Sequence, residues 1–93
     1  MPTRVGFHAT LRSIVGAKHV EVDLADGATV GDLVAHLVAR WPELGESLLD
    51  ASGALSRRVH VYVDGRSSRW LDGEMTVLPA NATIDVIPAV AGG

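Results

Sequence analysis

Near its start, the chain alternates between apolar and polar residues in two stretches, which is the period of a strand with one buried face. The first stretch covers residues 4–12 and the second covers residues 19–24. A segment over residues 13–17 that contains a glycine separates them, as expected for a turn. The pattern therefore predicts an N-terminal β-hairpin.

An amphipathic helix is predicted after the Asp-Gly pair at residues 26–27. Its apolar positions recur at spacings of three and four residues, at Val30, Leu33, Val34, Leu37 and Val38. Thr29 and Asp32 have the spacing of a capping box, in which two side chains satisfy free backbone donors. Pro42 disfavours helix at the residue before it, so we expect the helix to end there.

The second half of the chain predicts three more strands. Leucines at positions 44, 48 and 49 first suggest one short helical turn, and a loop continues through residues 50–53. Residues 58–64 alternate clearly and end in the turn pair Asp64-Gly65. We expect a short pairing strand over residues 67–71, a crossover over 75–79 and a last strand over 82–87.

One amphipathic helix can cover only one face of a sheet, so the order of elements indicates an α+β fold. A mixed sheet of four to five strands with one main helix on one face has the layout of the β-grasp, or ubiquitin-like, fold. We divide the chain into a β-grasp domain over residues 1–88 and an extended, flexible tail over residues 89–93.

Composition narrows the classes of partner. The net charge is −3, and no basic run offers contacts for a phosphate backbone, so we expect no nucleic-acid partner. The chain contains no cysteine, which excludes disulfides, thiolate metal sites and a cysteine nucleophile. No apolar run is long enough for a membrane span or a signal peptide. We expect a cytoplasmic protein that does not bind a membrane.

The side chains do not form a recognisable catalytic motif. The four histidines lack the spacings that place two metal ligands on one face, so no metal site is predicted. Neither a nucleophile elbow nor a glycine-rich phosphate loop is present. His8 and His60 are expected on the sheet face away from the helix. The chain is therefore not predicted to act as an enzyme on its own.

The C-terminus carries the most specific chemical signal. Pro88 favours extended backbone, Ala91 and Val90 are small or modest in size, and Gly92 and Gly93 have no side chains. A frayed end is the ordinary interpretation of a terminal glycine pair. Here the pair follows the last strand of a predicted domain without a spacer. Such a segment could enter a narrow channel, where the carboxylate of Gly93 could be activated by ATP.

These residues resemble a known family. Residues 88–93 read Pro-Ala-Val-Ala-Gly-Gly, which is similar to the ending of the ubiquitin-like sulfur carriers typified by MoaD, ThiS and CysO, most of all the CysO type. Residues 58–64 resemble the family's middle strand, and residues 71–73 with Thr76 resemble the stretch before its last strand. The first half of the chain agrees mainly in its pattern.

The resemblance implies a chemistry and its partners. An E1-like adenylating enzyme would use ATP to activate Gly93, and a sulfur donor would convert the product to a thiocarboxylate. A cysteine-synthase-like enzyme, a molybdopterin-synthase large subunit or a thiazole synthase would accept the sulfur. The loop over residues 43–55 and the ending at residues 88–93 favour the cysteine-synthase-like acceptor. The chain itself would bind no cofactor, and His60 and Tyr62 are candidates for partner docking.

Two alternatives remain open from the sequence. A ubiquitin-like modifier would join the same tail to lysines of target proteins, although the single lysine, Lys18, limits self-linked chains. A permanent small subunit of molybdopterin synthase would keep its tail inserted in one partner.

Overall fold

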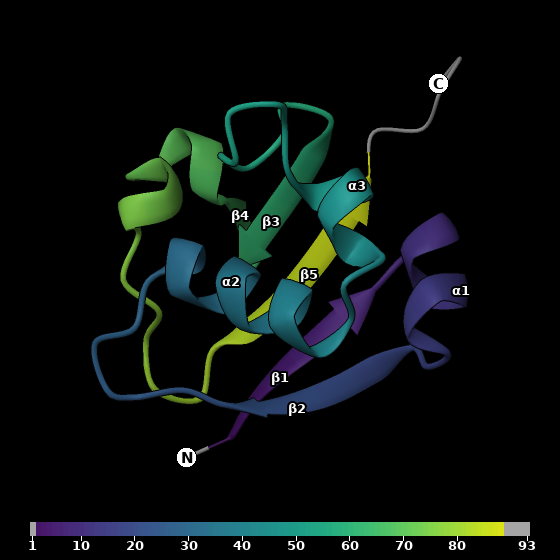
Figure 1. Ribbon diagram of the computed structural model, residues 1–93. Helices are drawn as coiled ribbons and strands as arrows, with labels where there is room; N and C mark the ends of the chain where they lie inside the picture. Colours follow the sequence, from purple (N-terminus) through teal and green to yellow (C-terminus); the bar gives the residue numbers. More distant parts are fainter. Residues whose placement is uncertain (1, 89–93) are drawn as a thin grey trace.

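The computed structural model describes residues 2–88 and is built on one mixed sheet of five strands (Figure 1). The strands are β1 (Pro2–Phe7), β2 (His19–Asp23), β3 (Val59–Val63), β4 (Arg66–Ser67) and β5 (Thr83–Pro88). They lie in the order β2-β1-β5-β3-β4. The first and last strands are parallel, and the other neighbours are antiparallel. This is a β-grasp sheet, as the sequence pattern predicted.

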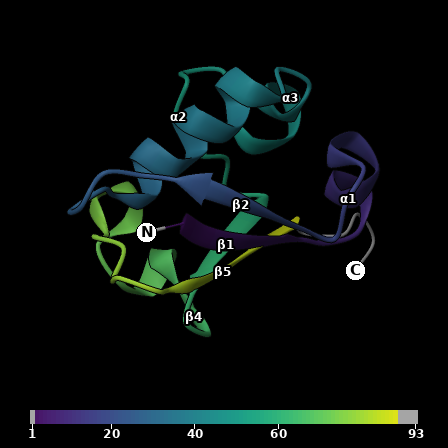
Figure 2. The same cartoon turned by 90° about the horizontal axis from the view of Figure 1, so that it is seen from below.

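Helices cover one face of the sheet and leave the other face open. Figure 2 shows α2 (Val30–Arg40) and α3 (Leu44–Leu48) on the same side, while α1 (Thr10–Val15) lies beside one end of the sheet. The core fills the space between this face and the helices. Its largest fully buried side chains include Phe7, Leu11, Leu33, Leu37, Leu44, Leu48 and Ile84.

The main helix forms where its local signals predicted. The Thr29 side chain accepts from the backbone N–H of Asp32, and the Asp32 carboxylate accepts from the backbone N–H of Thr29. Both bonds satisfy donors that a helix start leaves free. The apolar stripe is buried at Val30, Leu33, Val34 and Leu37, and Trp41 caps the end before Pro42. The predicted capping box and helix end are confirmed.

The predicted first strand is too long. β1 ends at Phe7, and Thr10–Val15 form helix α1 in place of the predicted strand end and turn. Ala9 has a positive φ of 54°, which interrupts the extended backbone. Leu11 can then point into the core from a helix, and Gly16 ends that helix with a left-handed φ of 81°. Alternation alone did not distinguish these two conformations.

The predicted strand over residues 67–71 is also largely wrong. β4 contains only Arg66–Ser67, and the chain continues into two 3₁₀ helices, η1 (Ser68–Trp70) and η2 (Gly73–Met75). The turn before β4 is as predicted, with positive φ at both Asp64 and Gly65. A two-residue strand makes few ladder bonds, so the chain leaves the sheet edge immediately.

The loop that the sequence left undefined is held by its own hydrogen bonds. The Asp50 carboxylate accepts from the hydroxyl and backbone N–H of Ser52 and from the backbone N–H of Ala54. These bonds, that from the Ser52 hydroxyl most strongly, hold the pKa of Asp50 below its usual value. Leu49 and Leu55 then pair across the loop, which brings the chain to β3.

Candidate functional site

The described part of the tail region is its base, at the end of β5. The predicted reactive residue Gly93 and its access residues Gly92, Ala91 and Val90 lie outside the described residues, as does the division of a domain at 1–88 from a tail at 89–93. β5 ends at Pro88, which lies opposite Val59 of β3. The structure therefore describes the last residue before the predicted tail.

That residue belongs to a strand in the middle of the sheet. β5 pairs with β1 on one side and with β3 on the other, and its side chains Ile84 and Val86 are 0% and 1% exposed. Hydrogen bonds on both sides and burial of one face resist local opening of such a strand. The tail thus follows a strand that is hydrogen-bonded on both sides and buried on one face.

The predicted docking residues lie beside this strand on the open face. His60 pairs with Ile87 and Tyr62 pairs with Asp85, and both aromatic side chains are half-buried. Their ring centroids are 6.0 Å apart. The valines between them point into the core, as the alternation predicted. Their place on the face away from the helices is confirmed, while their role in docking stays a prediction.

A histidine and an aspartate meet on the same face, which the sequence did not reveal. His8 Nε2 lies 3.0 Å from Asp85 Oδ1, with the side chains 40% and 32% exposed. The open-face position of His8 is as predicted, but its partner depends on the parallel register of β1 and β5. Exposed pairs of this kind contribute about 0–1 kcal/mol, so this one chiefly fixes the direction of the two side chains.

Gly6 makes room for that pair. A Cβ at Gly6 would lie 2.7 Å from Asp85 Oδ1 and 3.3 Å from Cδ2 of His19. The first of these distances is shorter than real Cβ contacts allow. The carboxylate of Asp85 therefore occupies the space that a side chain would take. An extended strand that contains glycine is one signal in the sequence for such a close approach.

The titratable side chains on the described residues do not assemble into a metal centre. Across residues 2–88, no group of three His, Asp or Glu side chains could hold a metal ion. None of the helices in the same range is long and apolar enough to cross a membrane.

Comparison with known proteins places this geometry in a family. A model of the ThiS family matches residues 5–93, which includes the tail. The chain belongs to the ThiS family. The matched residues include most of the five-stranded sheet and continue through Gly93.

Two curated relatives illustrate the range of this family. Small archaeal modifier protein 3 of Haloferax volcanii is 37% identical over 93 residues, which is 100% of both chains. The sulfur carrier protein CysO of Mycobacterium tuberculosis is 35% identical over 71 residues, or 74% of this chain and 76% of the relative. The predicted likeness to sulfur carriers, with CysO among them, is confirmed. The likeness to an archaeal modifier extends over a larger part of the chain.

Solved structures of a modifier and of a sulfur carrier both superimpose on this chain. SAMP1 from Haloferax volcanii superimposes with a TM-score of 0.88 at 26% identity, over 100% of both chains. A chain in the BexX/CysO complex of Amycolatopsis orientalis gives a TM-score of 0.78 at 29% identity, over 98% of this chain and 99% of that one. The relatives are thus small carriers and modifiers, and one was solved together with another protein.

We predict that Gly6→Ala lowers the free energy of unfolding by about 1 kcal/mol, because overpacking costs about 1–3 kcal/mol while leaving glycine in a strand regains about 0.5–1 kcal/mol. Urea denaturation measures the change. In an Asp85→Ala background the added methyl meets no carboxylate, so the same substitution should be neutral or stabilising. An equal loss in both backgrounds would contradict this explanation of Gly6.

Proposed function

We propose that this protein is a sulfur carrier whose Gly93 carboxylate is adenylated by an E1-like enzyme and then converted to a thiocarboxylate. The observation that carries the proposal is the ThiS-family match through Gly93, on a chain whose last strand lies at the centre of its sheet. The naming of CysO as a sulfur carrier supports it. The protein is then a substrate of its partners rather than an enzyme.

The proposed reaction has two steps. The Gly93 carboxylate attacks the α-phosphorus of ATP, and pyrophosphate leaves to give an acyl-adenylate. A donor then supplies sulfur as hydrosulfide (HS⁻), which attacks the acyl carbon, and AMP leaves to give the Gly93 thiocarboxylate. ATP belongs to the activating enzyme, and the carrier itself binds no cofactor. Because the activation consumes ATP, the proposal places the protein in the cytoplasm.

The sulfur acceptor is a biosynthetic enzyme under this proposal. A cysteine-synthase-like enzyme is the first candidate, because the Pro-Ala-Val-Ala-Gly-Gly ending resembles the CysO type. A molybdopterin-synthase large subunit or a thiazole synthase would use the same thiocarboxylate. A permanent complex with a molybdopterin-synthase large subunit would differ in the lifetime of the assembly rather than in the chemistry.

A second function, conjugation to target lysines, is favoured by one observation. The archaeal modifier protein matches the whole chain at 37% identity. In that reaction the amine of a target lysine, rather than sulfur, attacks the activated Gly93 carbonyl. The same adenylate serves both reactions, so a single chain could do either. Because Lys18 is the single lysine, linkage between copies would have one side-chain acceptor.

Partner docking is proposed for the open face next to the tail base. Tyr62 and His60 lie on the strand beside β5, and Ile87 of β5 adds an apolar side chain directly opposite His60. Aromatic residues are enriched at the centres of protein interfaces because they bury much area with few rotatable bonds. A partner that holds the tail would cover this face without contacting the helices on the other side.

Removing Gly93 should abolish loading and leave the fold unchanged. The deletion moves the terminal carboxylate by about 3.5 Å along an extended chain. A misplacement of about 1 Å can already cost 100-fold in rate, so we expect at least about a 100-fold loss of pyrophosphate release with the activating enzyme. Intact-mass measurement should show no exchange of oxygen for sulfur at the C-terminus of the truncated chain. Its urea denaturation midpoint should match that of the full chain.

Gly92→Val is the matched variant, because it keeps the terminal carboxylate and adds bulk where a channel must pass. It should also lose activation. Sulfur loading of the Gly93-deleted chain would contradict the carrier proposal. Lysine-linked conjugates of the full chain, with no thiocarboxylate at any stage, would replace it with the modifier function.

Substituting the docking face should weaken binding without changing the tail. We expect Tyr62→Ala to raise the dissociation constant for the activating enzyme about tenfold, as truncation of an interface aromatic often costs more than 1 kcal/mol. Isothermal titration calorimetry measures the change. His36→Ala, on α2 across the sheet, serves as the control and should bind normally. Equal losses from both variants would locate the interface elsewhere.

A further inference from the structure

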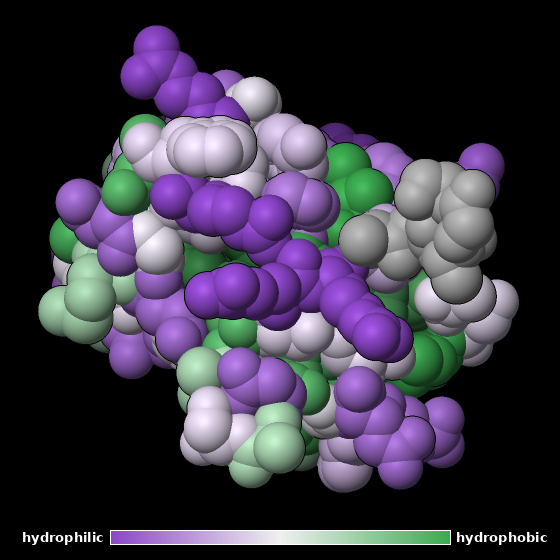
Figure 3. All heavy atoms as spheres, turned by 90° about the horizontal axis from the view of Figure 1, so that it is seen from above, coloured by the Kyte–Doolittle hydropathy of each residue, from purple (hydrophilic) through white to green (hydrophobic). Residues whose placement is uncertain are grey.

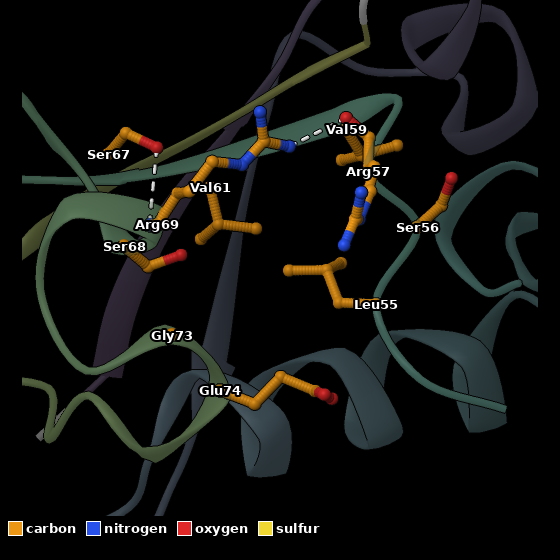
Figure 4. A pocket seen from close by; sticks show the side chains of 10 residues that line it. All are labelled: Leu55, Ser56, Arg57, Val59, Val61, Ser67, Ser68, Arg69, Gly73 and Glu74. Atoms are coloured by element: carbon orange, nitrogen blue, oxygen red, sulfur yellow. Dashed lines mark hydrogen bonds between the residues drawn. The ribbon is translucent and has the colours of Figure 1, made fainter. Parts of the chain in front are cut away.

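A second site is suggested by a pocket of about 180 Å³ beside β3. Figure 4 shows it between the start of β3, the loop before β3 and the two 3₁₀ helices. Val59 and Val61 form its apolar floor together with Leu55. These valines face the core, while Ser67, which also lines the pocket, lies with its Oγ 3.5 Å from His60 Nδ1, so the pocket is at the β4 edge of the sheet.

One guanidinium is held across the wall of this pocket. Arg69 Nη2 donates to the carbonyl of Arg57 at 2.6 Å, and the backbone N–H of Arg69 donates to Ser67 Oγ at 3.3 Å. The bond from Nη2 fixes the direction of a long side chain before any ligand arrives. Such preorganisation lowers the entropy cost of binding. The remaining N–H groups of Arg69 are available to an acceptor.

The second guanidinium comes from Arg57 itself. In Figure 4 its side chain turns into the pocket toward Leu55. Within residues 2–88 it makes no hydrogen bond or ion pair. The neighbouring Arg58 does not line the pocket. Figure 3, which views the molecule from the side where this loop lies, shows a band of hydrophilic side chains with hydrophobic atoms visible beneath it.

A serine hydroxyl completes the polar part of the pocket. Ser68 is 2% exposed, and its side chain points into the pocket in Figure 4. Its hydroxyl has no hydrogen-bond partner among the described side chains and backbone groups. No fully buried side-chain oxygen or nitrogen within residues 2–88 lacks a partner, so the Ser68 oxygen reaches the open space of the pocket, which would admit an acceptor. Ser68 can donate to an oxygen held between the two arginines.

The remaining wall limits the charge of a ligand. Glu74 lines the pocket from η2, opposite the arginines. Two guanidiniums and one carboxylate leave the lining with one net positive charge. A monoanion satisfies this balance, whereas a dianion such as phosphate would meet repulsion from Glu74. The apolar floor favours a ligand that also carries a hydrocarbon part.

We propose that this pocket binds a carboxylate on a short apolar stem, either a free aliphatic acid or the acidic side chain of a peptide. The carboxylate accepts from Arg57, Arg69 and Ser68, and the stem packs on the half-buried Leu55, because Val59 and Val61 are only 3% and 1% exposed. Charge-assisted bonds from a guanidinium are the strongest available to such a ligand. Binding here does not depend on activation of Gly93, so it is independent of the proposed function.

The direct test is titration of the ¹⁵N-labelled protein with isovalerate, followed by amide chemical shifts. Amides that line the pocket, including those of residues 57, 68 and 69, should shift and saturate. Isovaleramide has the same shape without the charge and should bind at least about tenfold more weakly. Equal binding of the two compounds, or shifts confined to other surfaces, would overturn the proposal.

Variants separate the pocket from general surface charge. Arg57→Gln and Ser68→Ala should each weaken isovalerate binding about tenfold, while Arg58→Gln should leave it unchanged. A loss of affinity in Arg58→Gln equal to that in Arg57→Gln would show a nonspecific charge effect and overturn the site.

The sign of the Glu74 effect tests the ligand's charge. Glu74→Gln should strengthen isovalerate binding, because it removes a negative charge that repels the carboxylate. It should also narrow the difference in affinity between isovalerate and inorganic phosphate. Weaker isovalerate binding in Glu74→Gln would overturn the assignment of a monoanion. A blocked glutamate tripeptide that binds more tightly than isovalerate would identify a peptide as the source, and the reverse order would identify a free acid.

Discussion

The burial of β5 between β1 and β3 is the constraint on which the rest of the molecule depends. The first and last strands are parallel neighbours, so the chain between them must return across the sheet, and α2 lies in the connection from β2 at one edge to β3 on the other side of β5. Ile84 and Val86 lock the last strand into the core. Because β5 also leads directly to the C-terminus, the same packing that completes the fold supports the base of the tail that the proposed function makes reactive.

This arrangement separates the domain's two tasks. One face of the sheet is covered by helices and supplies the stability, while the open face carries side chains whose directions are set by local contacts. The His8–Asp85 pair lies over Gly6, and Tyr62 and His60 lie on the neighbouring strand. In the proposed function the catalytic groups belong to the partners, so the carrier needs an accessible carboxylate and a recognisable surface rather than an active site of its own.

Signals that act within a few residues predicted the structure well, and signals that depend on distant partners did not. The capping box at Thr29 and the turn at Asp64 are local, so the helix and the turn before β4 were predictable. Leu11 suits either a strand or a helix, and only the positive φ at Ala9 decides between them. The contact of His8 with Asp85 and the pocket around Arg57 depend on pairings and packing across the sheet, which a pattern along the chain does not contain.

Intact-mass analysis of the protein isolated from its native cell tests the central claim most directly. The sulfur-carrier account predicts a fraction whose mass exceeds that of the unmodified chain by one sulfur in place of one oxygen, located by fragmentation at Gly93. Treatment that hydrolyses thiocarboxylates should return this fraction to the unmodified mass. The account would be contradicted if no thiocarboxylate formed at Gly93 under conditions of active sulfur metabolism and Gly93 were found only in amide bonds to lysine.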